Sequence, residues 1–258
     1  MIYGIDKLLC DKNIIYKETT NSTNSDLKEL AKEGAKEGTI IISEHQTGGK
    51  GRLGKSFYSP KGCGLYFSIL LRPDFSPDFA PLITVACAVS VMRAVKTVYQ
   101  TETEIKWVND IYSGGKKFCG ILTESSISPK DKKLEFAVLG IGINLEVPKT
   151  GYPEEFAFKT TAISEFAKEI PENHKSLLVS EIIKEFDGFY KNLENKQYIN
   201  EYRESSCVLG KEINILSGKH MGKATAIDIN ENAELVALLE NGEKITLGSG
   251  DISISFNQ

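Results

Sequence analysis

The 258-residue sequence has few of the residues that build metal or disulfide sites. It contains three histidines and five cysteines, and the cysteines are scattered, odd in number and free of any CxxC pair. This pattern argues against a disulfide framework and a structural zinc site, and it fits a reducing compartment. Internal repeats and low-complexity segments are also absent from the sequence.

An excess of positive charge is missing as well. The net charge of -4 and the pI near 5.6 argue against a protein that mainly binds nucleic acid nonspecifically. Residues 1–7 contain no cationic leader, and the longest apolar stretch, near residues 82–92, falls short of the roughly 18 residues of a membrane span. These features and the scattered cysteines lead us to expect a cytoplasmic protein that does not bind membrane. Residues 1–17 leave no room for a helix-turn-helix, so we expect no DNA binding.

The composition, 41% hydrophobic and 26% charged, suits a large domain followed by a small one. Apolar runs at helical spacing predict a helix after residues 19–26 and others at 82–99 and about 175–195. Apolar or alternating runs predict strands at 13–17, 39–43, 64–71, 104–110, 117–124 and 134–144. Strands joined by short turns favour an α+β fold with a mixed or antiparallel sheet and helices on one side.

The tail differs in kind from the rest of the chain. It has five short apolar runs, at 212–216, 223–227, 235–239, 244–247 and 252–254, and Asn241-Gly242 favours a type I′ turn. Five short strands in about fifty residues predict a small β-barrel. We therefore place a main domain at 1–205 and a β domain at 206–258.

A glycine-rich basic loop covers residues 46–55, with four glycines and three cations. Glycine allows close backbone approach, and Lys50 and Arg52 add donors, so the loop suits an anion such as phosphate or carboxylate. A flexible, solvated surface loop explains the same residues about equally well. We interpret the loop as neither a Walker A loop nor a dinucleotide-binding fingerprint.

Residues 19–26 are rich in hydroxyl and amide side chains, which favours a helix N-terminus. One cap needs one or two such residues, so the surplus could bind a polar small molecule. A second cluster, residues 106–110, joins a cation, an indole, an amide and a carboxylate, and Lys117 follows it. These groups could activate a carboxylic acid with a nucleotide, although Trp107 is as easily a core residue and Lys117 a solvated one.

Taken together, five motifs in this order resemble biotin protein ligases. The resemblance implies a mixed β-sheet flanked by helices, similar to class II aminoacyl-tRNA synthetases and lipoate ligases, with a small SH3-like C-terminal β-barrel. The motifs are Ser22-Thr23-Asn24, Gln46 with the loop through Gly54, Lys106-Trp107-Val108-Asn109-Asp110, Lys117 with Gly120-Ile121-Leu122, and Gly140-Ile141-Gly142-Ile143-Asn144.

The resemblance implies a ligase with ATP and biotin as substrates and Mg²⁺ as the metal. Biotin is activated to biotinyl-5′-AMP and transferred to a lysine of a biotin carboxyl carrier protein domain of a carboxylase or decarboxylase. Mg²⁺ is expected to be held mainly through phosphates, with Asp110 as the candidate protein ligand. The sequence leaves the oligomeric state undecided, and a homodimer is one option. Because the DNA-binding domain of bifunctional members is missing, we expect no repressor activity.

The resemblance also assigns site residues, with Lys117 and Arg52 as the catalytic pair. The residues expected to contact biotin are Ser22, Thr23, Asn24, Gln46, Lys50, Gly51, Arg52, Lys117 and Gly120. The residues expected to contact ATP or the adenylate are Arg52, Phe57, Lys106, Trp107, Asn109, Asp110, Lys117 and Asn144.

Three positions depart from the family pattern: Lys50 stands where arginine is usual, Val108 where proline is usual, and Phe57 where tryptophan is common. Two other functions stay open. A lipoate or octanoate ligase or transferase would share the architecture, but the polar residues 22–24 and 46 suit a ureido ring better than an apolar tail. A non-catalytic nucleotide- or RNA-binding module would use the basic loop, but the acidic balance of the chain disfavours it.

Overall fold

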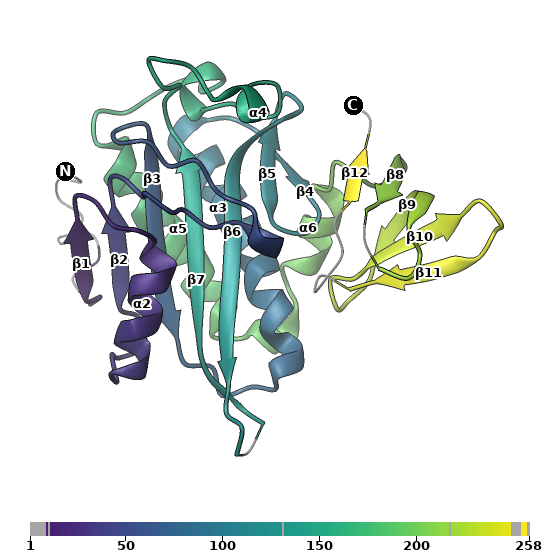
Figure 1. Cartoon of the computed structure of the whole chain (residues 1–258), viewed down its shortest axis with the longest axis horizontal. Coiled ribbons are helices and arrows are strands. Elements are labelled where there is room, and N and C mark those ends of the chain that lie inside the picture. The colour runs from purple at the N-terminus through teal and green to yellow at the C-terminus, as the bar shows by residue number, and fades with distance from the viewer. Residues whose placement is uncertain (1–8, 10, 131, 217, 249–253, 257–258) are drawn as a thin grey trace.

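A computed structural model describes residues 9, 11–130, 132–216, 218–248 and 254–256, which form a large α+β body and a smaller β lobe (Figure 1). The body contains a seven-stranded sheet with the order β1-β2-β3-β7-β6-β5-β4. Strand β1 pairs parallel with β2 and every other pair is antiparallel, so the predicted mixed sheet is confirmed. Its strands are β1 (Ile14–Lys17), β2 (Ile40–Ser43), β3 (Gly64–Leu71), β4 (Glu104–Lys106), β5 (Asp110–Ser113), β6 (Lys116–Ile127) and β7 (Leu134–Asn144).

Helices cover both faces of this sheet (Figure 1). On one face, α2 (Thr23–Lys32) buries Leu27 and Ala31 against side chains of β2, β3 and β7. On the other face, α3 (Ala80–Tyr99) and α5 (His174–Tyr190) cover the large core formed by the alternate residues of the same strands. The prediction of helices on one side is therefore wrong, because the short amphipathic helix after residues 19–26 packs on the opposite face.

The remaining helical segments of the described chain are short. They are α4 (Glu154–Ala157) and α6 (Ile199–Glu204), with the 3₁₀ turns η1 (Arg52–Gly54), η2 (Pro77–Phe79), η3 (Ile163–Glu165) and η4 (Leu193–Asn195). The helix predicted at about 175–195 ends at Tyr190, and the chain turns into η4 after Asn192. The strand predicted at 104–110 is also divided, because Lys106 pairs with Asp110 and closes a hairpin between β4 and β5.

Helix α3 is long and strongly apolar. Together with η2 it spans Pro77–Tyr99, which is long and apolar enough to cross a membrane by length and composition, and an 18-residue stretch within it has a mean hydropathy of 1.6. The sequence-based estimate of a shorter apolar stretch is thus corrected. Because 72% of that stretch is buried inside the protein, it has the character of a core helix.

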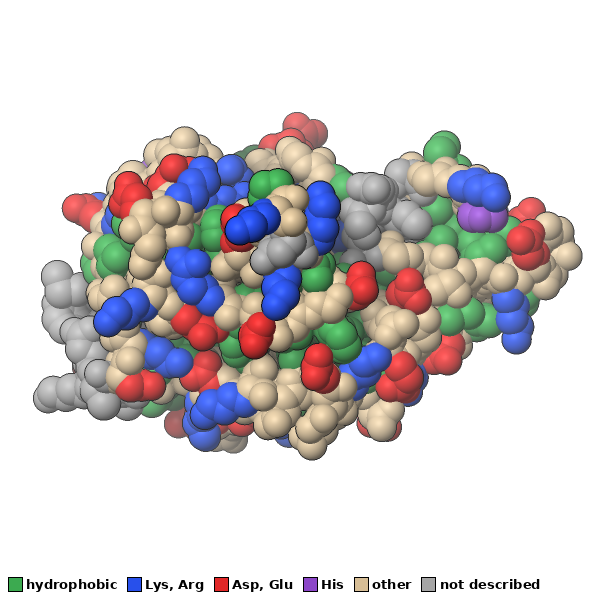
Figure 2. All heavy atoms as spheres, turned by 90° about the horizontal axis from the view of Figure 1, so that it is seen from below, with side chains coloured by type: hydrophobic (Ala, Val, Ile, Leu, Met, Phe, Trp, Pro, Cys, Tyr) green, Lys and Arg blue, Asp and Glu red, His purple; other side chains and the backbone are tan. Residues whose placement is uncertain are grey.

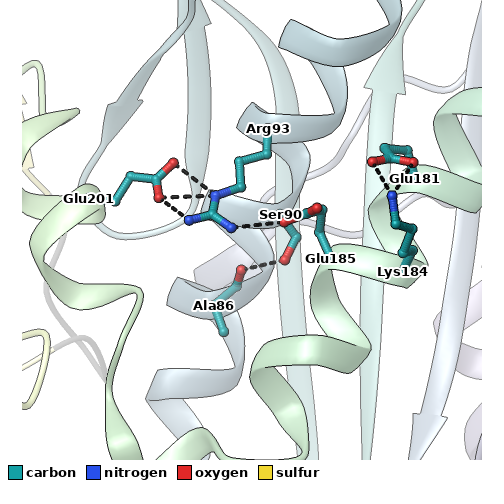
Figure 3. Close-up of polar contacts among 7 residues, drawn as sticks. All are labelled: Ala86, Ser90, Arg93, Glu181, Lys184, Glu185 and Glu201. Atoms are coloured by element: carbon teal, nitrogen blue, oxygen red, sulfur yellow. Dashed lines mark hydrogen bonds and ion pairs between the residues drawn. The ribbon is translucent and has the colours of Figure 1, made fainter.

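Arg93 on α3 ties three helices together (Figure 3). Its guanidinium pairs with Glu185 of α5 at 2.9 Å and with Glu201 of α6 at 2.5 Å, and its carbon Cζ lies 4.9 Å from the centre of the Phe189 ring. The outer helical layer is therefore fixed by charge as well as by apolar packing.

The C-terminal lobe is a five-stranded antiparallel sheet with the order β11-β10-β9-β8-β12. Its strands are β8 (Glu212–Ile215), β9 (Gly222–Ile229), β10 (Leu235–Leu239), β11 (Lys244–Leu247) and β12 (Ile254–Phe256). The predicted strands are confirmed, except that residues 252 and 253 of the last one lie outside the described chain. Closure of this sheet into an SH3-like barrel stays a prediction.

The turn between β10 and β11 differs from the predicted type I′. The N–H of Gly242 donates to the carbonyl of Leu239, and Gly242 has a φ of 84°, whereas Asn241 is not among the residues with positive φ. A type I′ turn needs positive φ at both central residues, so glycine instead follows the turn in the left-handed conformation.

Candidate ligand cavity on the sheet

A cavity of about 640 Å³ lies on the α2 side of the sheet. Four segments that are far apart in the sequence enclose it: the start of α2, the loop after β2, the residues around the β4–β5 hairpin, and residues 155–160. Every residue predicted to contact biotin, ATP or the adenylate lines this cavity except Asn144. The structure therefore brings the ordered motifs into one place.

The floor of the cavity is made of glycines at alternate positions of β6 and β7. A Cβ atom on Gly140 would lie 2.1 Å from Oδ1 of Asn24, and a Cβ atom on Gly142 would lie 2.7 Å from the ring of Phe57. Side chains on one face of a strand recur every second residue, so these glycines leave that face bare. The sequence analysis named Gly140 and Gly142 within a motif but assigned only Gly120 to ligand contact, although glycine at every second position of a strand was a usable signal.

Hydroxyl and amide groups line one end of the cavity. Ser22 occupies the N-cap position of α2, yet its side chain makes no capping hydrogen bond, so capping does not explain this residue. Oε1 of Gln46 accepts hydrogen bonds from the backbone N–H of Thr23 at 2.9 Å and from its hydroxyl at 3.2 Å. Nε2 of Gln46 donates to Ser59, which leaves a second N–H on that nitrogen for a ligand.

Asn24 lies beside these residues, but its amide bonds within the protein. Its Nδ2 donates to Glu124 at 2.8 Å and to the carbonyl of Leu122 at 3.3 Å, and its Oδ1 accepts from Ser68 at 2.6 Å. Both N–H groups therefore have protein acceptors.

Cations gather at the other end of the cavity. Nζ of Lys117 lies 2.7 Å from Oδ1 of Asp110 and 5.7 Å from the centre of the Phe57 ring. Arg52 reaches in from the glycine-rich loop, and its Nη1 donates to Oδ1 of Asn109 at 3.2 Å. The loop and the strand motif thus meet through direct contact.

The cavity is positive although the whole chain is acidic. Six cations and two carboxylates line it, whereas the face of the molecule in Figure 2 carries both signs interspersed. Burial lowers the pKa of Arg52 and that of Lys106, and in both cases the Asp110 carboxylate opposes the shift only partly. An anionic ligand would therefore stabilise these cations.

The glycine-rich loop separates this cavity from a second one of about 670 Å³, and residues 50–55 line both. The ammonium of Lys50 donates to the hydroxyl of Ser25 on α2 at 2.7 Å, so this contact holds the loop against the helix.

The sequence of residues 49–56 matches the Walker A pattern GxxxxGK[ST], which the sequence analysis overlooked. The fold is nevertheless not a P-loop, because the segment forms η1 and returns through a bridge between Lys50 and Ser56 rather than opening a helix.

Two predicted residues have structural roles in the observed arrangement. Trp107 is 4% exposed, and its indole N–H donates to the carbonyl of Ala233 in the C-terminal lobe at 2.9 Å. Asn144 is buried and donates to the carbonyl of Thr161, which places it behind the cavity wall rather than in it. A direct contact of either residue with nucleotide stays a prediction.

Sequence reasoning missed the segment that closes the cationic end. Glu155, Phe156, Lys159 and Thr160 line the cavity, and Phe156 stacks on Tyr58 with ring centres 6.1 Å apart. Backbone hydrogen bonds between Lys117 and residues 159 and 161 hold this segment to the start of β6. No periodic pattern marks it in the sequence.

The donor set bears on the expected Mg²⁺. In the described part of the chain, no group of three or more histidine, cysteine or acidic side chains could hold a metal. Asp110 and Glu155 are the carboxylates that line the cavity, and the ion pair of Asp110 with Lys117 leaves its second oxygen as a candidate ligand. Such a site fits a Mg²⁺ ion bound mainly by phosphate oxygens and water.

Comparisons with known proteins agree with this geometry. A model described as the biotin/lipoate A/B protein ligase family matches residues 16–144. The bifunctional ligase/repressor BirA of Bacillus subtilis is 31% identical over 258 residues, which cover 98% of this chain and 77% of that protein. The biotin–[acetyl-CoA-carboxylase] ligase of Mycobacterium tuberculosis is 29% identical, over 90% of this chain and 85% of that protein.

A solved structure supports the same relationship. The biotin protein ligase from Aquifex aeolicus, in complex with biotin and ATP, has a TM-score of 0.77 and 25% identity. The alignment covers 95% of this chain and 100% of that one. The chain therefore belongs to the biotin/lipoate A/B protein ligase family.

Proposed function

We propose that the protein is an ATP-dependent biotin protein ligase. The observation that carries this proposal is a single cavity with a hydroxyl and amide end at Ser22, Thr23 and Gln46 and a cationic end at Arg52 and Lys117. Biotin has the matching polarity, with a polar ureido ring at one end and a carboxylate at the other. Two of the similar proteins named above, those of Mycobacterium tuberculosis and Aquifex aeolicus, are biotin ligases, which supports the same proposal.

In the first step, a carboxylate oxygen of biotin attacks the α-phosphorus of ATP. An acyl–phosphate bond forms, the bond to the β-phosphate breaks, and pyrophosphate leaves. Two anions must approach each other, so fixed cations and N–H donors are needed to offset their repulsion and the charge of the transition state. We assign this task to Lys117 and Arg52, which converge on the cavity from β6 and from the loop.

The other assignments follow from position. Gln46, Thr23 and Ser22 bind the ureido end, and the glycines of the floor let the ring lie against the sheet. Lys106, Asn109 and Phe57 serve the adenylate. Mg²⁺, when bound with ATP, would neutralise phosphate charge, and Asp110 is the side chain that would hold it.

In the second step, the neutral amine of a carrier lysine attacks the acyl carbon. An amide bond forms, the bond to the phosphate oxygen breaks, and AMP leaves. The loop over residues 50–55 covers the cavity, and it would keep water from the labile anhydride until the lysine arrives.

Several further expectations belong to this proposal. We infer a catalytic domain at 1–205 and an SH3-like domain at 206–258, a biotin carboxyl carrier protein domain as the partner, and a cytoplasmic enzyme. The position of the five-stranded sheet beside Trp107 supports a role for the second domain in completing the site. A homodimer is one assembly that this fold allows.

Transfer to a carrier domain tests the function. The protein is incubated with ATP, Mg²⁺ and a biotin carrier domain, in parallel with biotin, octanoate or lipoate, and the carrier lysine is analysed by mass spectrometry. We expect a biotinylated lysine and no acylation by the other two acids, because the Ser22 and Gln46 end offers polar groups rather than an apolar tunnel. Acylation by octanoate or lipoate, without biotinylation, would instead establish a lipoate-type ligase.

A further inference from the structure

A chain of polar contacts, buried around Ser68 and part-buried elsewhere, runs beneath the polar end of the cavity, and the chemistry of the ligase does not account for it. It begins at an ion pair between Lys28 on α2 and Glu124 on β6, whose side chains are 29% and 23% exposed. It continues from Glu124 through Asn24 and Ser68 to Thr23 and Gln46. Glu124 thus connects to the ligand end without being one of the residues predicted to contact ligand.

Glu124 fixes which way the Asn24 amide faces. A carboxylate can only accept hydrogen bonds, so the amide nitrogen must face Glu124 and the carbonyl oxygen must face Ser68, as the 2.8 Å and 2.6 Å contacts show. Burial alone would raise the pKa of Glu124, but hydrogen bonds from Lys28 and Asn24 outweigh it and lower that pKa. The carboxylate therefore remains an acceptor at neutral pH.

Asn24 stands at the edge of the glycine floor. Its amide fills the space above Gly140, where a Cβ atom would lie 2.1 Å from Oδ1 and 2.8 Å from Cγ. Glu124, the Leu122 carbonyl and Ser68 hold this amide in place. Without Glu124, the amide would lose its charged acceptor and could swing across the floor.

We propose that Glu124 is a positioning residue for biotin, which holds Asn24 against Gly140 so that Asn24 shapes the cavity wall instead of donating hydrogen bonds to the ligand. This inference rests on the proposed function. The ion pair with Lys28 anchors Glu124, and the Ser68 hydroxyl, whose single proton is donated to Asn24, lies 2.8 Å from the hydroxyl of Thr23, which contacts Gln46.

Calorimetric titration with biotin tests the role of Glu124 in the full chain. For Glu124→Ala we expect the Kd for biotin to rise about 10-fold, since a hydrogen bond to a charged group is lost. Glu124→Gln keeps an acceptor oxygen and should stay within about 3-fold of the wild type. Glu135→Ala removes an exposed glutamate from the neighbouring strand β7 and is the matched control, with no change in Kd expected.

A double-mutant cycle with Asn24→Ala separates positioning from general stability. If Glu124 acts through Asn24, Glu124→Ala adds no further loss of biotin affinity in the Asn24→Ala background, and the KM for ATP stays within about twofold of the wild type. Three results would overturn this inference while leaving the proposed function intact. Glu124→Ala could bind biotin as tightly as the wild type, or the losses of affinity in the two single variants could add in the double variant. The third result is an equal loss for biotin and for ATP in Glu124→Ala that Glu124→Gln does not restore. A wild-type protein that does not bind biotin would overturn the proposed function as well.

Discussion

At the scale of single residues, the absence of side chains shapes the cavity as much as their presence. Gly120, Gly140 and Gly142 lie on one face of β6 and β7, and the added Cβ of each would meet Lys117, Asn24 or Phe57 at less than normal contact distance. The groups that we assign to ligand binding can approach the sheet only because these positions are bare.

Gly142→Ala tests this interpretation of the floor. The new methyl group would lie 2.7 Å from the Phe57 ring, and relief of such overpacking costs about 1–3 kcal/mol. We expect kcat/KM for adenylate formation to fall about 10-fold. Gly188→Ala on α5 is the control: its Cβ meets nothing within 4 Å, and alanine should stabilise the helix by about 0.5–1 kcal/mol without changing the rate. An equal rate for Gly142→Ala and wild type would contradict the account of the floor.

Single residues also show what sequence reasoning could reach. The order of the motifs predicted that Gln46, Arg52, Lys117 and their companions form one site; the structure places them around one cavity, and their contacts with ligand stay predictions. It could not decide between capping and ligand binding for Ser22, because both use the same hydroxyl group. Nor could it reveal that the Asn24 amide is satisfied inside the protein, since its acceptor on Glu124 lies 100 positions away.

At the scale of elements, the helical layer over the far face of the sheet depends on Arg93 (Figure 3). Its guanidinium donates to carboxylates on two helices, and the aromatic ring of Phe189 lies 4.9 Å away. Isolated surface ion pairs contribute about 0–1 kcal/mol, and a bidentate network contributes more. The side chain is 42% exposed, so solvent screening still limits the gain.

For Arg93→Ala we expect the free energy of unfolding to fall by about 1–2 kcal/mol, measured by urea denaturation. Lys184→Ala serves as the control, because Lys184 pairs with Glu181 within α5 alone and is exposed; its change should stay within about 0.5 kcal/mol. If both variants unfold at the same urea concentration, Arg93 does not join the helices as we describe.

Elements whose hydrophobic residues recur with a clear period, or form a long apolar run, were predictable from the sequence, and the others were not. The runs at β3, β7 and α3 are long and apolar, so their existence and type were correctly predicted. Residues 154–160 mix charged and aromatic side chains without a period, and their position depends on backbone pairing with the start of β6. The face of the sheet on which α2 packs likewise depends on contacts with distant strands, which no local sequence pattern predicts.

At the scale of the whole molecule, the C-terminal lobe contacts the body through Trp107, which lines the cavity. Trp107 belongs to the strand motif of the body but hydrogen-bonds Ala233 of the lobe, and Arg203 donates to the carbonyl of Ile229 at 2.7 Å. The apolar core is continuous across this junction. The composition of the tail predicted its five strands, but no local pattern could encode contacts between residues more than one hundred positions apart.

The most direct test of the central claim is formation of the acyl-adenylate in the absence of any carrier domain. The full chain is mixed with biotin, Mg²⁺ and ATP labelled in the α-phosphate, and the label is followed into biotinyl-5′-AMP. We predict that the wild type and Lys116→Ala, an exposed neighbour, form the adenylate, whereas Lys117→Ala forms almost none because the cation beside Asp110 is lost. Label that remains in ATP with wild-type protein, or an adenylate formed at the normal rate by Lys117→Ala, would contradict the account.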